Sequence, residues 1–270
     1  MKISIIQLLV EGAEPERNID RAINFINNCE DADLVLLPET LDFGWTHPFA
    51  KENSKPIPGE FSDRFCKIAK RKNIWICLGL TEKTASGNYN TALLINREGK
   101  IVLKHQKINL LEVEFPFYQI GKKLEVVDTE FGKIGLNICA DNYYNSTYIG
   151  NSLAAMGAQI ILSPSSWTVS HEITEGNNPY KEKWLKPFNY LAKNHNLIVA
   201  STTAVGYIIG GPYVGKKMIG KSLVVGPSGI ISEGIQNEFA TEIVEVDFEL
   251  PLNSNKGEQI GNYINLQKWE

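Results

Sequence analysis

The feature that most constrains how this 270-residue chain can fold is a pattern of apolar and polar segments that occurs twice. Apolar residues that alternate with period 2 predict strands, and those that recur with a period of 3.6 residues predict helices. In the first half this predicts a strand, a helix, a strand, a helix, a strand and a hairpin, at 2–9, 18–28, 34–37, 63–72, 74–80, and 91–96 with 100–104. A turn at Arg97-Glu98-Gly99 supports the hairpin.

The second half follows the same course. The predicted elements are a strand, a helix, a strand, a helix, a strand and a hairpin, at 133–139, 145–156, 159–162, 185–193, 197–201, and 222–225 with 230–232. Local sequences match as well, since DADLVLL corresponds to GAQIILS and KRKNIWICLGL corresponds to AKNHNLIVAST. The chain therefore reads as two β-α-β-α-β-β units.

Each unit exposes an apolar sheet face, which is buried most simply by packing the two sheets together with the helices outside. The predicted fold class is therefore α/β, a four-layer α-β-β-α sandwich with an internal pseudo-twofold repeat. We expect a single domain over 1–270, with the sandwich at 1–252 and a polar C-terminal extension at 253–270. Irregular stretches at 41–59, 168–183 and 206–220 interrupt the repeat, and such loops are usually functional.

Composition narrows the classes of function. A net charge of −4 without a basic block gives no reason to expect a nucleic-acid partner. No apolar run reaches the roughly 20 residues that cross a bilayer, and the first ten residues read as a strand rather than a secretion signal. Four scattered cysteines and four distant histidines fit no zinc site. We expect a cytoplasmic protein without a metal or cofactor.

Two residues stand at the ends of predicted core strands. Glu39 ends DLVLLPE, so a carboxylate lies at the carboxyl end of a strand covered on both faces. Cys139 ends KIGLNIC on the small and polar face of its strand, before a predicted helix that Asp141 or Asn142 could cap. A helix N-terminus there would lower the thiol pKa. Taken singly, each of these two residues is compatible with a purely structural role as well as with a catalytic one.

Lys107 follows the first hairpin in KIVLKHQKINL, where a solvated surface charge is the ordinary interpretation. His105 lies two residues earlier and should point the same way. Because histidine is the usual base for a cysteine nucleophile, a Cys139–His105 pair is an alternative to any role for Glu39. It predicts that His105→Ala loses activity and that Glu39→Gln keeps some.

Together, LVLLPET, KHQKINL and GLNICAD resemble the glutamate, lysine and cysteine motifs of the nitrilase (carbon–nitrogen hydrolase) superfamily, in its amidase-like branch. The resemblance covers nearly the whole chain and implies the same α-β-β-α sandwich. EFPFYQIG resembles the segment that carries a second glutamate in that family, which maps to Glu114 rather than Glu112.

The resemblance implies hydrolysis of a small-molecule amide, with release of ammonia or an amine. Cys139 would attack the carbonyl and form a thioester, and Glu39 would move the protons. Lys107 and the backbone N–H of Ala140 would stabilise the oxyanion, while Glu114 would hold Lys107. The resemblance also implies a homodimer or a higher homo-oligomer.

The sequence departs from some branches of the family after the cysteine. Ala140-Asp141 replaces the Trp-Glu of nitrilases, and no arginine follows closely to grip a carboxylate, so the sequence favours an amide that is neutral or cationic. Tyr143, Trp167 and Trp45 are candidate substrate-binding residues. A ureido (N-carbamoyl) substrate, acyl transfer to an amine, and a non-catalytic binding protein on the same scaffold remain alternatives.

Overall fold

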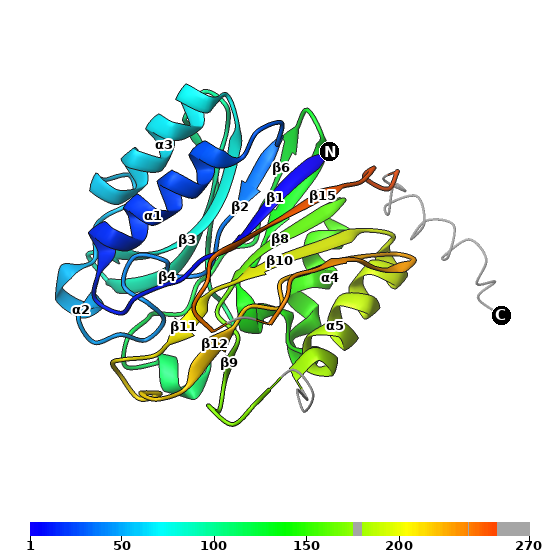
Figure 1. Ribbon diagram of the computed structural model, residues 1–270. Coiled ribbons are helices and arrows are strands. Elements are labelled where there is room, and N and C mark those ends of the chain that lie inside the picture. Colours follow the sequence, from blue (N-terminus) through cyan, green and yellow to red (C-terminus); the bar gives the residue numbers. More distant parts are fainter. Residues whose placement is uncertain (175–179, 237, 253–270) are drawn as a thin grey trace.

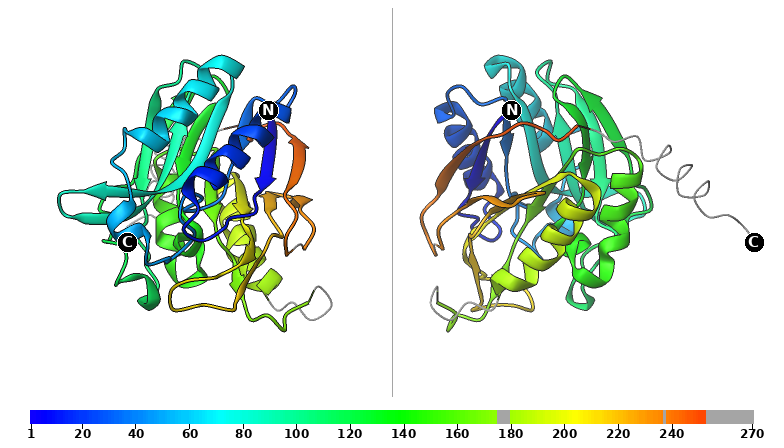
Figure 2. Two further views of the ribbon diagram at one scale, coloured as in Figure 1. Left: turned by 60° about the vertical axis from the view of Figure 1, so that its left-hand side comes forward. Right: turned by 90° about the vertical axis from the view of Figure 1, so that its right-hand side faces the viewer.

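The computed structural model describes residues 1–174, 180–236 and 238–252. Two six-stranded sheets lie face to face, as Figures 1 and 2 show. Helices α1 (Pro15–Asn28) and α3 (Glu60–Lys72) cover the outer face of one sheet, and α4 (Thr147–Ala155) and α5 (Tyr180–His195) cover the other. The predicted α-β-β-α sandwich is confirmed, whereas the predicted extension at 253–270 lies outside the described residues.

The first sheet has the strand order β15-β1-β2-β3-β4-β5. Its strands, in chain order from β1 to β5 and then β15, are Lys2–Gln7, Leu34–Leu36, Trp75–Thr84, Gly87–Ile95, Ile101–Gln106 and Glu242–Asp247. The second sheet has the order β14-β13-β10-β8-β7-β6. Its strands β6, β7, β8, β10, β13 and β14 are Val126–Thr129, Gly132–Leu136, Ile160–Ser165, Ile198–Thr203, Leu223–Gly226 and Gly229–Glu233.

The strand pairing bears out the repeat. In the first sheet β1, β2 and β3 are parallel and β4 and β5 continue antiparallel. In the second sheet β7, β8 and β10 are parallel and β13 and β14 continue antiparallel. Both terminal hairpins also carry a register shift, between Leu94 and Ile95 and between Val224 and Val225.

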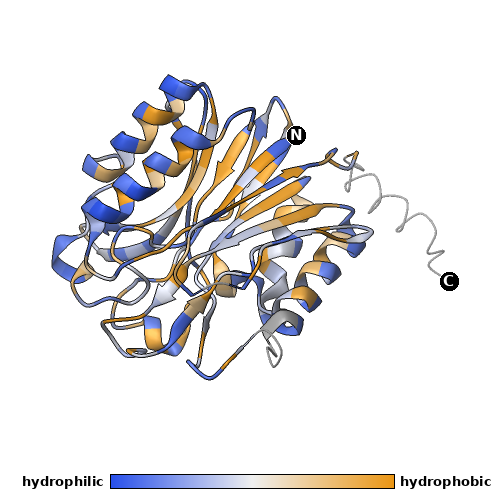
Figure 3. Cartoon of the chain, viewed as in Figure 1, coloured by the Kyte–Doolittle hydropathy of each residue, from blue (hydrophilic) through white to orange (hydrophobic). Residues whose placement is uncertain are grey.

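Alternation along the strands divides the core into two layers. Along β2, Leu34 and Leu36 pack into the cluster between the sheets, while Val35 packs against the helical layer. α1 meets that layer with the stripe Ile19, Ala22, Ile26, and Pro15 starts the helix where its missing N–H costs nothing. Figure 3 shows the strands as predominantly apolar ribbons. Both faces of the central strands are therefore buried, which explains their continuous apolar runs.

The structure differs from the predicted elements at the edges. Strands β6 and β15 were not predicted, because half-exposed edge strands lack a buried run. Two of the three stretches predicted to be irregular contain a small sheet made of β9 (Thr168–Val169), β11 (Val205–Tyr207) and β12 (Lys217–Ile219). The third contains the single turn of α2 (Ala50–Asn53). None of the described helices is long and apolar enough to cross a membrane.

Candidate active site

Four chain segments bring ionisable side chains together at one edge of the two sheets. Glu39 follows β2, Lys107 directly follows β5, and Glu114 ends the short 3₁₀ helix η1 (Glu112–Glu114). Cys139 follows β7 in the other sheet and begins the 3₁₀ helix η2 (Cys139–Asn142). The four residues that the sequence predicts to be catalytic therefore converge, although no two of them belong to the same strand or helix.

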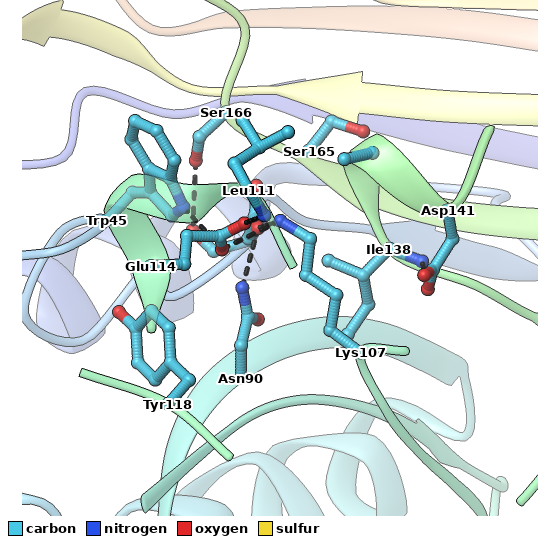
Figure 4. Close-up of polar contacts among 12 residues, drawn as sticks. Trp45, Asn90, Lys107, Leu111, Glu114, Tyr118, Ile138, Asp141, Ser165 and Ser166 are labelled. Carbon is cyan, nitrogen blue, oxygen red and sulfur yellow. Dashed lines mark hydrogen bonds and ion pairs between the residues drawn. The ribbon is translucent and has the colours of Figure 1, made fainter. Parts of the chain in front are cut away.

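Lys107 lies at the centre of this cluster (Figure 4). Its Nζ donates to Glu39 Oε1 at 2.9 Å and to Glu114 Oε1 at 2.8 Å, and all three side chains are buried. Burial lowers the pKa of Lys107, but the charges of Glu114 and Glu39 prevail and hold it well above its usual value. Lys107 is therefore a fixed, permanently charged ammonium rather than the surface charge that its local sequence suggests.

The two oxygens of Glu39 have different surroundings. Oε1 accepts from Lys107 and, at 2.6 Å, from Asn90 Nδ2. Oε2 is buried and has no hydrogen-bond partner among the residues that the structure describes. Burial raises the pKa of the Glu39 carboxyl, and the Lys107 charge opposes that rise. One oxygen thus fixes the carboxylate while the other can receive a proton.

Glu114 is held at both oxygens. The Trp45 indole N–H donates to Oε1 at 2.8 Å, and the Leu111 backbone N–H donates to Oε2 at 2.8 Å. Because Oε1 also accepts from Lys107, the carboxylate cannot turn without breaking several bonds. The exposed Glu112 does not share these contacts, so the structure brings Glu114, rather than its neighbour, to Lys107.

Cys139 has a backbone conformation that is unusual for a residue with a side chain. Its φ of 43° lies in the left-handed region, and such strain is concentrated at functional sites. The side chain lines a cavity but is only 6% exposed. The expected lowering of the thiol pKa by a helix N-terminus is wrong. Burial, followed by the charge of Glu39, raises the pKa well above its usual value, and α4 begins only at Thr147.

Two groups oppose that rise in the pKa of Cys139. They are the Lys107 ammonium and the backbone N–H of Ser166, which hydrogen-bonds the sulfur. The free thiol is therefore the resting form, and a nearby base must take its proton before it can attack. Cys29, Cys66 and Cys77 have raised pKa values through burial. None of them lines the cavity beside Cys139.

Asp141 ties the cysteine loop to the lysine loop. Its carboxylate accepts the backbone N–H groups of Ile138 (2.9 Å), Ile108 (3.2 Å) and Asn109 (2.7 Å). The His105 Nε2 lies 2.8 Å from the same carboxylate. His105 therefore pairs with Asp141, and no hydrogen bond joins it to Cys139 in the described part of the chain. This geometry gives no support to the alternative Cys–His pair.

A cavity of about 550 Å³ opens onto Cys139. Each of the three stretches that interrupt the repeat contributes to its wall, through Trp45, through Thr168 with Lys183 in the first turn of α5, and through Tyr213 with Lys216. Among the residues that the structure describes, the lining consists of Trp45, Leu111, Glu112, Val113, Cys139, Tyr143, Ser166, Thr168, Lys183, Trp184, Tyr213 and Lys216. The loops thus shape the space into which the thiol faces.

The predicted substrate-binding residues differ in their positions. Tyr143 and Trp45 line the cavity, and Ala140 is buried directly after the thiol. Trp167 does not line it. Its ring lies behind Trp184, stacked at 4.6 Å between centroids with an interplanar angle of 4°, and Trp184 forms the wall instead. Trp167 was predicted because its strand is the repeat partner of the strand before Glu39, and the repeat could not indicate which of two stacked indoles faces the space.

Several residues of the site escaped the sequence analysis. Asn90 is buried on β4 and donates to Glu39, but its neighbours Asn88 and Thr91 are polar as well, so the local pattern did not single it out. Lys183 and Trp184 lie in the first turns of α5, before the predicted helix at 185–193, and Lys216 lies in the loop between β11 and β12, so no periodicity pointed to any of them.

Comparisons with known proteins agree with this geometry. The family model described as "Carbon-nitrogen hydrolase" matches residues 2–252. A protein named "Nitrilase" from Pyrococcus abyssi is 27% identical, with 94% of this chain and 92% of that protein covered. A "Deaminated glutathione amidase" from Dictyostelium discoideum is 28% identical, with 84% and 80% covered.

Solved structures share the fold. The amidase from Nesterenkonia sp. superposes with a TM-score of 0.79 at 20% identity, covering 98% of this chain and 96% of that one. A carbon-nitrogen hydrolase from Helicobacter pylori G27 gives a TM-score of 0.80 at 19% identity, covering 100% and 94%. The match over residues 2–252 shows that this chain belongs to the carbon-nitrogen hydrolase family, enzymes of the nitrilase superfamily that hydrolyse non-peptide carbon–nitrogen bonds.

Proposed function

We propose that the chain is an amidase in which Cys139 is the nucleophile, Glu39 the proton carrier and Lys107 the oxyanion ligand. The observation that carries this proposal is the asymmetry of Glu39. Its Oε1 is fixed by Lys107 and Asn90, while Oε2 is unpartnered among the described residues. Glu39 is also the charge that raises the pKa of the Cys139 thiol most strongly. A buried thiol beside a base with one unoccupied oxygen is suited to general-base activation.

The proposed first half of the reaction forms a thioester. Glu39 takes the proton of the Cys139 thiol as the sulfur attacks the amide carbonyl carbon. The carbonyl oxygen gains the negative charge, which Lys107 Nζ and the backbone N–H of Ala140 stabilise. Glu39 then gives its proton to the amide nitrogen, the C–N bond breaks, and ammonia or an amine leaves.

The second half of the reaction reverses these roles. Glu39 removes a proton from water, which attacks the thioester carbonyl and forms a second oxyanion at the same donors. Collapse of this intermediate breaks the C–S bond, the sulfur recovers its proton from Glu39, and a carboxylic acid is released. Glu114, held by Trp45 and Leu111, keeps Lys107 aimed at the oxyanion throughout.

The relatives support an amide substrate, since amidases occur among them, including "Omega-amidase NIT2" of Xenopus tropicalis at 26% identity over 63% of this chain. Transfer of the acyl group to an amine uses the same thioester, so product analysis with added amines separates it from hydrolysis. A ureido substrate would instead place a carbamoyl group on the sulfur, and turnover of ureido compounds against amides separates these two substrates. That the enzyme is a cytoplasmic homo-oligomer stays a prediction of the sequence.

The test is ammonia or amine release from a panel of small amides, ureido compounds and nitriles, run beside Cys139→Ala. We expect amide turnover that falls by about 10⁴-fold or more without the thiol, the scale seen when a covalent nucleophile is removed. Mass spectrometry of the wild-type protein, quenched during turnover, should reveal an acyl group on Cys139. Amide turnover that survives Cys139→Ala would contradict the proposal.

A further inference from the structure

The loop between β11 and β12, residues 208–216, is closed at its base by its own backbone. The Ile208 N–H donates to the Lys216 carbonyl oxygen, and the Gly215 N–H donates to the Ile208 carbonyl oxygen, both at 2.9 Å. The loop interrupts the repeat and supplies Tyr213 and Lys216 to the wall of the cavity. Because its two ends are tied together, the loop can fix a neighbouring segment as a single unit.

The loop comes closest to its neighbour at Gly211. This residue has a φ of 80°, in the left-handed region that favours glycine. A Cβ atom at this position would lie 2.4 Å from the backbone oxygen of Thr46, and one at Gly210 would lie 2.2 Å from the His47 ring. Atoms that are not bonded do not approach so closely. The two glycines therefore allow the loop to rest directly on the segment that contains Trp45.

Tyr213 extends this contact to the side chain of Trp45. The two rings meet edge to face, with 5.4 Å between centroids and an interplanar angle of 60°. Lys216 Nζ lies 3.6 Å from the centroid of the Tyr213 ring, which helps to keep that ring in place. The loop thus confines Trp45 through the neighbouring backbone and through its indole ring.

Trp45 connects the loop to the buried ion pairs (Figure 4). Its indole N–H and Lys107 Nζ both donate to Glu114 Oε1, each at 2.8 Å. Lys107 Nζ also lies 6.0 Å from the centroid of the Trp45 ring. Because Glu114 Oε1 holds both donors in a buried site, a shift of the indole changes the position of Lys107.

We infer that the β11–β12 loop is a positioning element for the reaction, which holds Lys107 at the oxyanion through Tyr213, Trp45 and Glu114. The inference rests on the proposed role of Lys107 and assigns a task to one of the stretches that interrupt the repeat. It predicts that disturbing the contact between the loop and Trp45 lowers kcat, because the oxyanion ligand moves. Tyr213 also lines the cavity, so the first test uses glycines, which have no side chain to contact a substrate.

Gly211 and Gly215 form a matched pair. Their φ angles are 80° and 84°, so alanine at either position adopts a similarly strained backbone. The added Cβ atom would lie 2.4 Å from the Thr46 oxygen at position 211, whereas at position 215 it would have nothing within 4 Å among the described residues. With the best amide of the panel above, we expect kcat to fall about tenfold in Gly211→Ala and by less than about twofold in Gly215→Ala. Equal losses would assign the effect to backbone strain and overturn the inference.

A second set of variants tests whether the effect passes through the indole. Trp45→Phe keeps a ring but removes the N–H that binds Glu114, and we expect kcat to fall by about 10–100-fold, as for a lost hydrogen bond to a charged group. Adding Gly211→Ala to Trp45→Phe should then lower kcat by less than about a further twofold, because the effects of coupled residues are not additive. Losses that multiply in full would show that the loop acts without Trp45, and would overturn the inference.

The surroundings of Lys107 can be observed without substrate. Its buried ammonium group should give proton–nitrogen NMR signals, which are assigned by their loss in Lys107→Gln. We expect these signals to shift in Gly211→Ala and in Trp45→Phe, and to stay unchanged in Gly215→Ala. Tyr213→Leu, which removes the ring contact without straining the backbone, should shift them as well, and it serves as the test if Gly211→Ala does not fold.

This measurement separates the inference from the proposed function. Signals that shift as expected support the loop as the element that positions Lys107, even if no amide of the panel is hydrolysed. Signals that stay unchanged in Gly211→Ala and Tyr213→Leu overturn the inference and leave the amidase proposal standing, provided that amide turnover depends on Cys139.

Discussion

The two halves of the fold have the same strands but different side chains where those strands meet. Strand register makes Leu34 and Ile160 equivalent, so Glu39 in the first half corresponds to Ser165 in the second. By the same register Cys139 corresponds to the buried Leu8. The first half supplies a charged group where the second has a hydroxyl, and the second supplies a nucleophile where the first has an apolar side chain.

The contact between the halves explains this difference. The backbone N–H of Glu39 approaches the carbonyl oxygen of its equivalent, Ser165, at 3.4 Å, so equivalent positions lie next to each other. A glutamate at both would put two buried carboxylates side by side, and one would have to take up a proton. The duplicated scaffold therefore accommodates one ionised set of groups. The repeat builds the site, and asymmetry at its centre makes the site functional.

The strongest test of this comparison removes the carboxylate of Glu39 and the hydroxyl of Ser165 in separate variants. We expect Glu39→Gln to lower kcat by about 10²–10⁴-fold, the range for loss of a general base. Ser165→Ala, the matched control, removes a hydroxyl that bonds Ser201 at 2.9 Å and should change kcat little. Steady-state ammonia release measures both. Equal losses in the two variants would mean that the halves contribute alike.

Lys107 tests the comparison through charge. By strand register, Lys107 in the first half is equivalent to Gln236 in the second. Lys107→Gln therefore gives the first half the residue that the second half has at this position. We expect kcat to fall by about 10²–10³-fold, as for a lost oxyanion donor. Unfolding should become easier by about 3–5 kcal/mol, because two buried carboxylates lose their cation. Denaturant unfolding should show partial recovery in Lys107→Gln/Glu114→Gln, and unchanged stability in the single variant would contradict this account.

Asp141 tests whether the loop that contains Lys107 must be held in place against the loop that contains Cys139. Asp141→Asn replaces an acceptor of three backbone N–H groups with a side chain that also donates. We expect kcat to fall by about 10²-fold, the effect of a small misplacement of reacting groups, with little change in KM. The rate at which iodoacetamide labels Cys139 should change in parallel. A raised KM with kcat intact would instead assign Asp141 to substrate binding.

The last comparison concerns the pH dependence of stability, and it contrasts two buried aspartates. Burial raises the pKa of Asp42 from its usual 3.8 to about 7. Its contribution to stability is therefore present below pH 3.8 and lost as the pH rises towards 7, at no more than about 1.4 kcal/mol per pH unit. Asp42→Asn should remove that slope, as unfolding at several pH values would measure. An unchanged slope would show that Asp42 is ionised in the folded chain.

Asp141 should behave in the opposite way. Burial raises its pKa, but the hydrogen bond and charge of His105 prevail and lower it. Its contribution to stability is present above the usual carboxyl pKa and is lost as the pH falls through the lowered value. Comparing Asp42→Asn with Asp141→Asn therefore separates a carboxyl that burial keeps protonated from one that its partners keep ionised.

The layers and the repeat could be predicted because they depend on strand period. The convergence of Glu39, Lys107, Glu114 and Cys139 was implied by the resemblance of their motifs to one family. Prediction from the sequence failed where geometry is set by tertiary contact. The pKa of Cys139 depends on burial and on Glu39, which is distant in sequence. Which of Trp167 and Trp184 faces the cavity depends on how the two rings stack. Edge strands β6 and β15 lack the two-sided burial that gives a readable pattern.

The contact of Glu39 with Ser165 has a consequence for how the enzyme matures. Neither half holds a working set of groups, since the first has the carboxylates and the ammonium while the second has the thiol. On the proposed mechanism, a chain in which only the first half has folded therefore has no amidase activity. On that mechanism turnover requires the two sheets to pack together, so the time at which turnover appears during refolding should report when they do so. A thiol of the second half that reacts with an added reagent before turnover appears would belong to a chain whose two sheets have not yet packed together.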